Sequence, residues 1–136
     1  MSEPYHLRCW TRFYASPEEI WAAQRQLASQ PSPVAVIPTL DWPDAVPDGA
    51  CVLTGSSSLF SSWEHARSLE IASDATRFLD AITFTTRAPS ASTDRVVRRL
   101  VLELFLRRHR QAARLLPTDR RATAVAVMRA MELELD

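Results

Sequence analysis

Residues 63–84, with the sequence WEHARSLEIASDATRFLDAITF, decide the fold. Successive residues in each half of this stretch fall on opposite faces of an extended strand. One face of the first strand carries Trp63, His65, Arg67, Leu69 and Ile71, and one face of the second carries Phe78, Asp80, Ile82 and Phe84. A two-residue turn at Ser73-Asp74 would join them as an antiparallel hairpin. The expected cross-strand pairs are Trp63 with Phe84, His65 with Ile82 and Arg67 with Asp80.

Charged residues on the two inward faces are the sharpest polar feature of this hairpin. Burying a charge is costly unless it is paired and hydrogen-bonded, so Arg67 and Asp80 are interpreted as a structural ion pair across the two strands. The functional alternative makes Arg67 an anchor for a carboxylate or enolate oxygen of a ligand, which Asp80 would orient. His65 shares this face and is interpreted as a buried, hydrogen-bonded histidine, with general acid or base chemistry as its alternative.

The residues before the hairpin predict a strand, a short helix and an irregular segment. Residues 5–14 alternate between apolar and polar and predict the first strand. Ser16-Pro17-Glu18-Glu19 forms a capping box in front of an apolar stripe, so a helix is expected from there to about Ser29. The proline-rich stretch 30–49 disfavours helix and is expected to be extended or loop-like.

Residues 93–116 carry the longest helical pattern, which ends at Pro117. Arg108 and His109 interrupt its broad apolar arc. We expect this turn to pass beyond the sheet edge, where both side chains reach solvent, and the alternative places either one over the mouth of a cavity. A second helix is expected over residues 119–136. The order of elements predicts an α+β chain, with one domain at 1–118 and residues 119–136 as its helical extension.

Composition excludes several classes of protein. The 16 basic and 16 acidic residues cancel, so no net field attracts nucleic acid, and the arginine-rich long helix is interpreted as a solvated face. Every basic residue other than histidine is arginine, a bias typical of a GC-rich bacterial genome, which excludes catalysis by a lysine Schiff base. Two glycines are too few for a dinucleotide or phosphate loop. The spacing of histidines and cysteines predicts neither a metal site nor a disulfide, and no cofactor is expected.

The chain lacks the usual signals for a membrane or for export. No apolar run approaches the roughly 20 residues that a membrane-spanning helix needs. The first ten residues do not combine a basic segment with a long apolar one. We therefore expect a cytoplasmic protein.

Four motifs occur in order along residues 5–116. They are ASPEEIW at 15–21, LFSSWEH at 59–65, DAITF at 80–84 and LFLRRHR at 104–110. Together they resemble the helix-grip superfamily of START-like lipid-transfer and polyketide cyclase or dehydratase-like (SRPBCC-type) proteins. The resemblance implies an antiparallel sheet curved around a long C-terminal helix, with a cavity between them for a hydrophobic molecule. The short segment between Ser29 and Phe60 implies a reduced sheet, and the expected last helix is an addition to the family pattern.

The resemblance implies that the chain binds, and as a transfer protein would transport, a hydrophobic or amphipathic small molecule such as a lipid. The expected ligand-binding residues are Trp63, His65, Arg67, Asp80, Phe84, Phe105 and Arg108. One alternative is a metal-free cyclase or dehydratase in which His65 and Asp80 are catalytic and exchange protons, while Arg67 stabilises an enolate. Another is an interaction protein with a filled cavity whose last helix forms a homodimer. The aromatic residues suit a cavity wall and a plain core equally.

Overall fold

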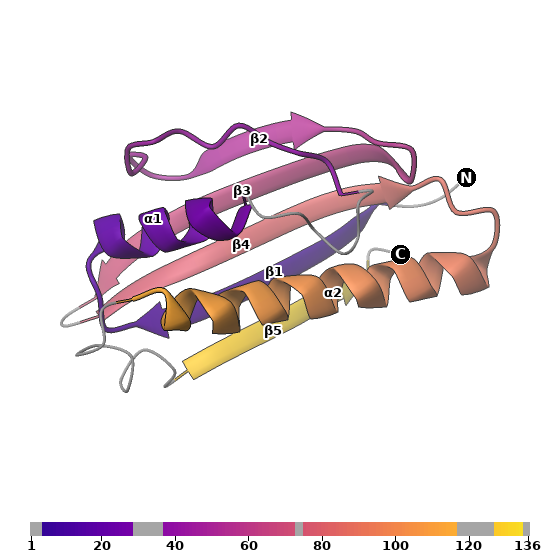
Figure 1. Ribbon diagram of the computed structural model, residues 1–136. Helices are drawn as coiled ribbons and strands as arrows, with labels where there is room; N and C mark the ends of the chain where they lie inside the picture. Colours follow the sequence, from indigo (N-terminus) through magenta and orange to yellow (C-terminus); the bar gives the residue numbers. More distant parts are fainter. Residues whose placement is uncertain (1–3, 29–36, 73–74, 117–126, 135–136) are drawn as a thin grey trace.

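The computed structural model describes residues 4–28, 37–72, 75–116 and 127–134, and its element order confirms the predicted α+β class (Figure 1). Five strands form one open antiparallel sheet in the order β2-β3-β4-β1-β5. The elements are β1 (Tyr5–Phe13), α1 (Pro17–Ala28), β2 (Cys51–Gly55), β3 (Phe60–Ala72), β4 (Ala75–Thr86), α2 (Ala91–Arg114) and β5 (Val127–Glu134). No helix in the described part of the chain is long and apolar enough to cross a membrane.

The central hairpin of β3 and β4 has the predicted register. Trp63 pairs with Phe84, His65 with Ile82 and Arg67 with Asp80. A one-residue slip would turn every apolar side chain of one strand to the other face of the sheet, so the shared parity of the two strands excludes it. The turn expected at residues 73–74 lies outside the described residues. The register shifts once, between Phe60 and Ser62, at the start of β3.

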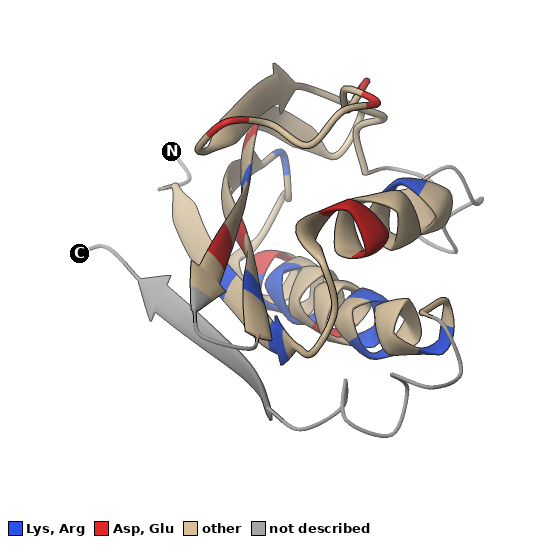
Figure 2. Cartoon of the chain, turned by 90° about the vertical axis from the view of Figure 1, so that its left-hand side faces the viewer, with Lys and Arg blue, Asp and Glu red and all other residues tan. Residues whose placement is uncertain are grey.

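Both helices lie on the same side of the sheet (Figures 1 and 2). The predicted capping box starts α1, because Ser16 Oγ accepts a hydrogen bond from the Glu19 amide at 3.2 Å and Glu19 Oε1 accepts one from the Ser16 amide at 3.2 Å. Ser90 caps α2 by accepting a hydrogen bond from the Thr93 amide at 3.2 Å. The sheet therefore has one face covered by helices, and that face carries the core.

The helix expected over residues 119–136 is wrong for its second half. Residues 127–134 form strand β5, which pairs antiparallel with β1 from Tyr5↔Glu134 to Arg12↔Val127. Residues 119–126 lie outside the described part of the chain. At the end of the chain Met131, Leu133 and Leu135 alternate with acids, a period of two that fits a strand, and β1 offers unpaired backbone groups to complete it. The idea of a homodimer through a last helix loses its basis.

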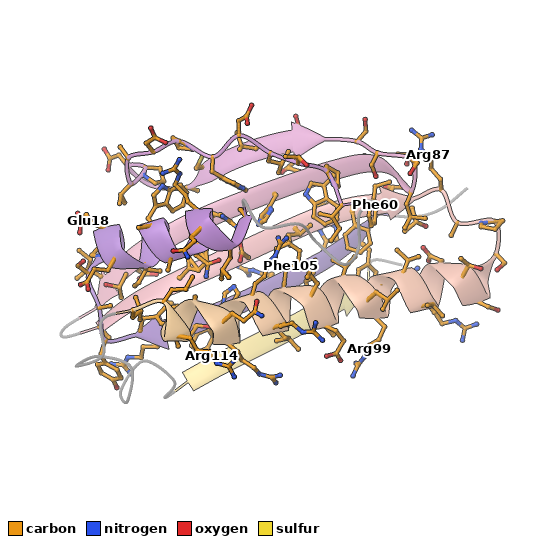
Figure 3. All side chains as sticks on the ribbon, viewed as in Figure 1. Glu18, Phe60, Arg87, Arg99, Phe105 and Arg114 are labelled. Atoms are coloured by element: carbon orange, nitrogen blue, oxygen red, sulfur yellow. The ribbon has the colours of Figure 1, made fainter. Side chains whose placement is uncertain are left out.

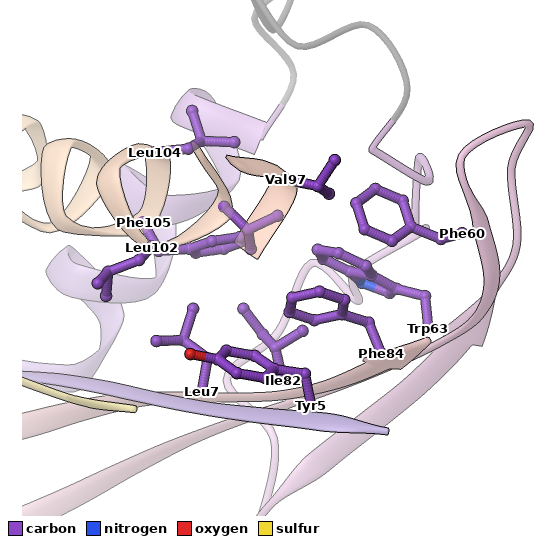
Figure 4. Packing of buried hydrophobic residues seen from close by; sticks show 11 residues of the cluster. Tyr5, Leu7, Phe60, Trp63, Ile82, Phe84, Val97, Leu102, Leu104 and Phe105 are labelled. Atoms are coloured by element: carbon purple, nitrogen blue, oxygen red, sulfur yellow. The ribbon is translucent and has the colours of Figure 1, made fainter. Parts of the chain in front are cut away.

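The covered face of the sheet carries two hydrophobic clusters. The first packs one end of the hairpin against α2 (Figure 4) and contains Tyr5, Leu7, Phe60, Trp63, Ile82, Phe84, Val97, Val101, Leu102, Leu104 and Phe105. The second joins α1, the end of α2 and the sheet, and contains Phe13, Ala15, Ile20, Ala23, Leu27, Phe78, Ala112, Ala113 and Leu116. Phe105 extends from α2 into the interior, whereas Arg99 and Arg114 extend outward (Figure 3). Buried polar residues occupy the same face of the sheet as these clusters.

The segment 37–50 runs from the α1 side of the molecule to β2 and is fastened at several points. Trp21 Nε1 of α1 donates a hydrogen bond to the Pro43 carbonyl at 2.8 Å, and Arg25 forms an ion pair with Asp44. At the end of β2, a Cβ on Gly55 would meet Pro38 and Leu40 side chains at 3.1 Å, so glycine permits this close approach. We call this segment the 37–50 loop.

Candidate functional site

Asp80 is the centre of a buried hydrogen-bond network that joins β1, β3, β4 and α2. The side chain of Asp80 is fully buried in the middle of β4. Its Oδ1 lies 2.6 Å from Nε2 of His65 and 2.9 Å from Nε of Arg67, both on β3. Its Oδ2 lies 2.8 Å from Nε2 of His109 on α2. We call Asp80, these three partners and Thr11 the Asp80 centre.

The Asp80 carboxylate is ionised. Burial alone would raise the pKa of Asp80, but the charge of Arg67 and the hydrogen bonds from His109 and His65 outweigh burial and hold this pKa well below its usual range. Both carboxylate oxygens already accept hydrogen bonds. Asp80 is therefore a poor proton acceptor, and its position suits it to orient its partners.

His65 is neutral at pH 7. Burial lowers the pKa of His65 to about 4, although Asp80 opposes this shift. Because Nε2 faces an ionised carboxylate at 2.6 Å, Nε2 carries the proton and Nδ1 carries the lone pair. The ring of His65 packs edge-on against Trp42 at 4.8 Å and Phe105 at 5.2 Å, measured between ring centroids. An imidazole with this pKa is a weak general base at pH 7.

His109 corrects the expectation that this turn of the long helix lies beyond the sheet edge in solvent. Its side chain is buried, stacks on Phe78 with centroids 5.2 Å apart and bridges Asp80 to Thr11. Nδ1 of His109 and Oγ1 of Thr11 share a hydrogen bond of 2.7 Å. Because a buried imidazole needs hydrogen-bond partners, the buried carboxylate of Asp80 and the hydroxyl of Thr11 account for the burial of His109.

Arg67 is the most deeply enclosed cation of the described residues, with 1% of its surface exposed. Its guanidinium carbon lies 4.4 Å from the ring centroid of Trp42 and 5.7 Å from that of Phe78. Both distances are within the range of a cation–π contact, which is a favourable arrangement. Its Nε is bonded to Asp80, but Nη1 is buried and has no hydrogen-bond partner among the described residues.

Arg108 is a second cation beside the Asp80 centre. Its side chain is half-buried, and its guanidinium carbon lies 5.3 Å from the ring centroid of Phe105, the ring that also contacts His65. Burial and the charge of Arg67 lower the pKa of Arg108, while Asp80 opposes this effect. Arg108 is therefore partly in solvent, as expected, and its charge also lowers the pKa of His65.

The expected aromatic residues lie together but pack against one another. Trp63 stacks on Phe84 with centroids 5.6 Å apart and lies 6.3 Å from Phe105. All three are buried in the first hydrophobic cluster (Figure 4). Nε1 of Trp63 is buried without a hydrogen-bond partner among the described residues. These three residues thus form the apolar wall next to His65.

A cavity of about 280 Å³ lies between the end of α1 and the 37–50 loop. Arg25 and Ala28 of α1 and Thr39, Leu40, Asp41 and Trp42 of the loop line it. Trp42 is only half-buried, yet its ring covers both Arg67 and His65. One indole ring therefore separates this cavity from the Asp80 centre.

Sequence reasoning identified three of the five residues of the centre. His65, Arg67 and Asp80 share one face of a hairpin whose register could be predicted. His109 carried a usable signal, because it lies seven residues from both Leu102 and Leu116 and so belongs to the apolar arc of the helix. Thr11 and Trp42 gave no comparable signal. Trp42 in particular depends on the path of a proline-rich loop.

The described residues also limit what chemistry the centre offers. No group of three or more His, Cys, Asp or Glu side chains in the described part of the chain is placed to hold a metal ion. Cys9, which pairs with Asp80 across β1 and β4, is not reactive, because burial and then the charge of Asp80 raise the pKa of its thiol to about 12. His65 and Asp80 are both weak proton acceptors at pH 7, as described above.

Comparison with known proteins gives one family match. The model of a domain of unknown function, DUF8410, matches residues 46–116, which is more than half of the chain. The matched region runs from the 37–50 loop through β2, β3 and β4 to the end of α2, and it contains all residues of the Asp80 centre except Thr11. No curated protein matches the chain, and no solved structure does. The chain belongs to the DUF8410 family.

Proposed function

We propose that the chain binds a small hydrophobic or amphipathic molecule in the cavity beneath the 37–50 loop. The observation that carries this proposal is the position of Trp42, which lines the cavity and also covers a buried guanidinium and a buried imidazole. Ligand sites are typically concave, mostly apolar and equipped with a few fixed polar groups. Displacement of the Trp42 indole ring would expose the guanidinium of Arg67 and the imidazole of His65 to this cavity.

The size of the cavity restricts the ligand. Pockets for small molecules usually start at about 300 Å³, and this cavity measures about 280 Å³. A ligand of the size of an aryl acetate or a medium-length acyl chain suits this space better than a large lipid.

The arrangement also supports a helix-grip architecture as part of the proposal. An open antiparallel sheet carries both helices on one face, and the long helix α2 packs along it (Figures 1 and 2). In this chain the sheet–α2 interface near Trp63 is closely packed, so we place the ligand towards α1.

Thermal unfolding with a panel of small probes tests the proposed function. The panel consists of three acid–amide pairs: phenylacetate and phenylacetamide, indole-3-acetate and indole-3-acetamide, and octanoate and octanamide. At a concentration ten times its Kd, a bound probe adds about 1.4 kcal/mol of stability, which raises the Tm by roughly 3–5 °C for a chain of this size. If no probe raises the Tm at millimolar concentration, the proposed function is wrong.

Two variants of α1 localise the binding. Ala28 lines the cavity, and Ala28→Trp should fill it and abolish the Tm shift. Ala22 lies on the exposed side of the same helix, so Ala22→Trp makes the same substitution outside the cavity and should leave the shift unchanged. An equal Tm shift in both variants would place the ligand elsewhere.

A further inference from the structure

Arg108 adds a second cation beside the Asp80 centre, whose one carboxylate is already paired with Arg67. Arg67 and Arg108 contribute two positive charges, and Asp80 contributes one negative charge. His65 is neutral at pH 7, as argued above, and adds no charge. A bound anion with a single charge would balance the second cation, which is partly withdrawn from water.

Two buried side chains near the cavity, Arg67 and Gln24, have polar atoms without a hydrogen-bond partner among the described residues. Nη1 of Arg67 is buried and has no partner among the described residues, although buried polar groups are almost always hydrogen-bonded. Gln24 of α1 is fully buried, and neither of its amide atoms has such a partner. Gln24 lies one helical turn from Ala28, which lines the cavity.

A planar acceptor fits the free part of the Arg67 guanidinium. Nε of Arg67 is bonded to Asp80, whereas Nη1 has no hydrogen-bond partner among the described residues and can bind a further acceptor. Arginine binds carboxylates through parallel N–H donors in the plane of the guanidinium. The ring of Trp42, which lies over this plane at 4.4 Å, leaves access from the edge rather than from the covered face.

We propose that the ligand of this site is a carboxylate whose oxygens bind Nη1 of Arg67 and lie in the field of Arg108, while its apolar part occupies the cavity beside Trp42. This inference rests on the proposed function, because it names the chemical class of the ligand at the same site. A carboxylate brings one negative charge and therefore balances the excess of one positive charge. A phosphate monoester brings nearly two negative charges and would leave the site negatively charged.

The acid–amide pairs separate this inference from the proposed function. Each amide has nearly the same size and shape as its acid but carries no charge. Isothermal titration of the wild-type chain should show at least one acid binding roughly tenfold more tightly than its amide, or more strongly still, as expected when a charged hydrogen bond is lost. Equal affinities for acid and amide would overturn the carboxylate inference and leave the proposed function intact. Absence of binding by every probe would overturn both.

Three arginine variants test whether the preference for an acid over its amide arises at Arg67 and Arg108. Arg67→Lys keeps a positive charge but removes the fork, and it should reduce the preference for the acid to about threefold or less. Arg108→Gln should lower the preference for the acid as well. If the Arg67 variant does not fold, this second variant tests whether the acid binds at the site. Arg107→Gln changes the neighbouring, exposed arginine of α2 and should keep the full preference. A full preference in Arg108→Gln, or a loss in Arg107→Gln, would show that the anion binds elsewhere.

Discussion

At the residue scale, Asp80 is the shared hydrogen-bond acceptor of the groups around it. Three side chains direct N–H donors at one carboxylate, and each of the three is itself buried. An ion pair in such a place contributes little net stability compared with apolar residues, but removing one partner leaves an uncompensated charge. Arg67 and Asp80, which share one face of the hairpin, thus form a structural pair, and Nη1 of Arg67 has no partner among the described residues.

The first prediction concerns the charge of Asp80. Asp80→Asn keeps the shape of the side chain but leaves Arg67 buried without a counter-charge, so the free energy of unfolding should fall by about 3–5 kcal/mol. Urea denaturation followed by circular dichroism measures this change. Glu64→Gln, on the exposed face of β3, is the matched control and should change stability by less than about 0.5 kcal/mol. A loss below about 1 kcal/mol in Asp80→Asn would contradict the described network.

The second prediction concerns the pH dependence of stability. The pKa of His65 is lowered from 6.5 to about 4 on folding, so below pH 6.5 the unfolded chain binds a proton at His65 that the folded chain does not. Stability should therefore fall as the pH decreases from 6.5 towards 4, with a slope from this group of up to about 1.4 kcal/mol per pH unit. Asp80, whose pKa is also depressed on folding, loses its contribution only below about pH 4, in a separate window.

Urea denaturation at pH 7.5, 6.0 and 5.0 measures this slope. His65→Gln removes the titrating group, so the decline between pH 6.5 and 5 should be shallower in the variant than in the wild type. Identical slopes in the two proteins would mean that His65 is not held neutral in the folded state.

At the element scale, the structure shows which patterns are readable from one sequence. The β3–β4 register could be predicted because both strands carry inward faces with the same parity, and the helices because capping boxes and apolar stripes are local signals. Strand β5 could not, because its apolar residues also fit a helical period and the choice depends on the distant edge of β1. The apolar arc of α2 indicates that His109 is buried, but its pairing with Asp80 depends on where α2 crosses the sheet, which no local pattern encodes.

The third prediction tests the start of α2, the element that brings His109 to the centre. Ser90 caps the helix through its side-chain oxygen, so Ser90→Ala should lower the free energy of unfolding by about 1 kcal/mol. Ser92→Ala, in the exposed first turn of the same helix, makes the same substitution without removing the cap and should change stability by less than about 0.5 kcal/mol. Equal effects of the two substitutions in thermal or urea unfolding would show that Ser90 does not act as the cap.

At the scale of the whole molecule, one face of a sheet combines apolar packing with a charged centre. The two hydrophobic clusters contain no charged residue, whereas Arg67, Asp80 and two histidines are buried on the same face. The 37–50 loop closes over these charges through Trp42 and is fastened to α1 by Trp21 and Arg25. Because the loop is an irregular segment on the surface, it is the part of the described fold best placed to admit a ligand.

Amide NMR with assigned side-chain signals tests the central claim most directly. Phenylacetate titrated into the wild-type chain should shift the indole N–H signal of Trp42 and the Nε–H signal of Arg67 along one saturable curve. The indole signal of Trp10, whose side chain lies over Arg77 on the other face of the sheet, is the internal control and should not move. Shifts confined to Trp10, or no saturable shift at Trp42 and Arg67, would contradict a ligand site at the Asp80 centre.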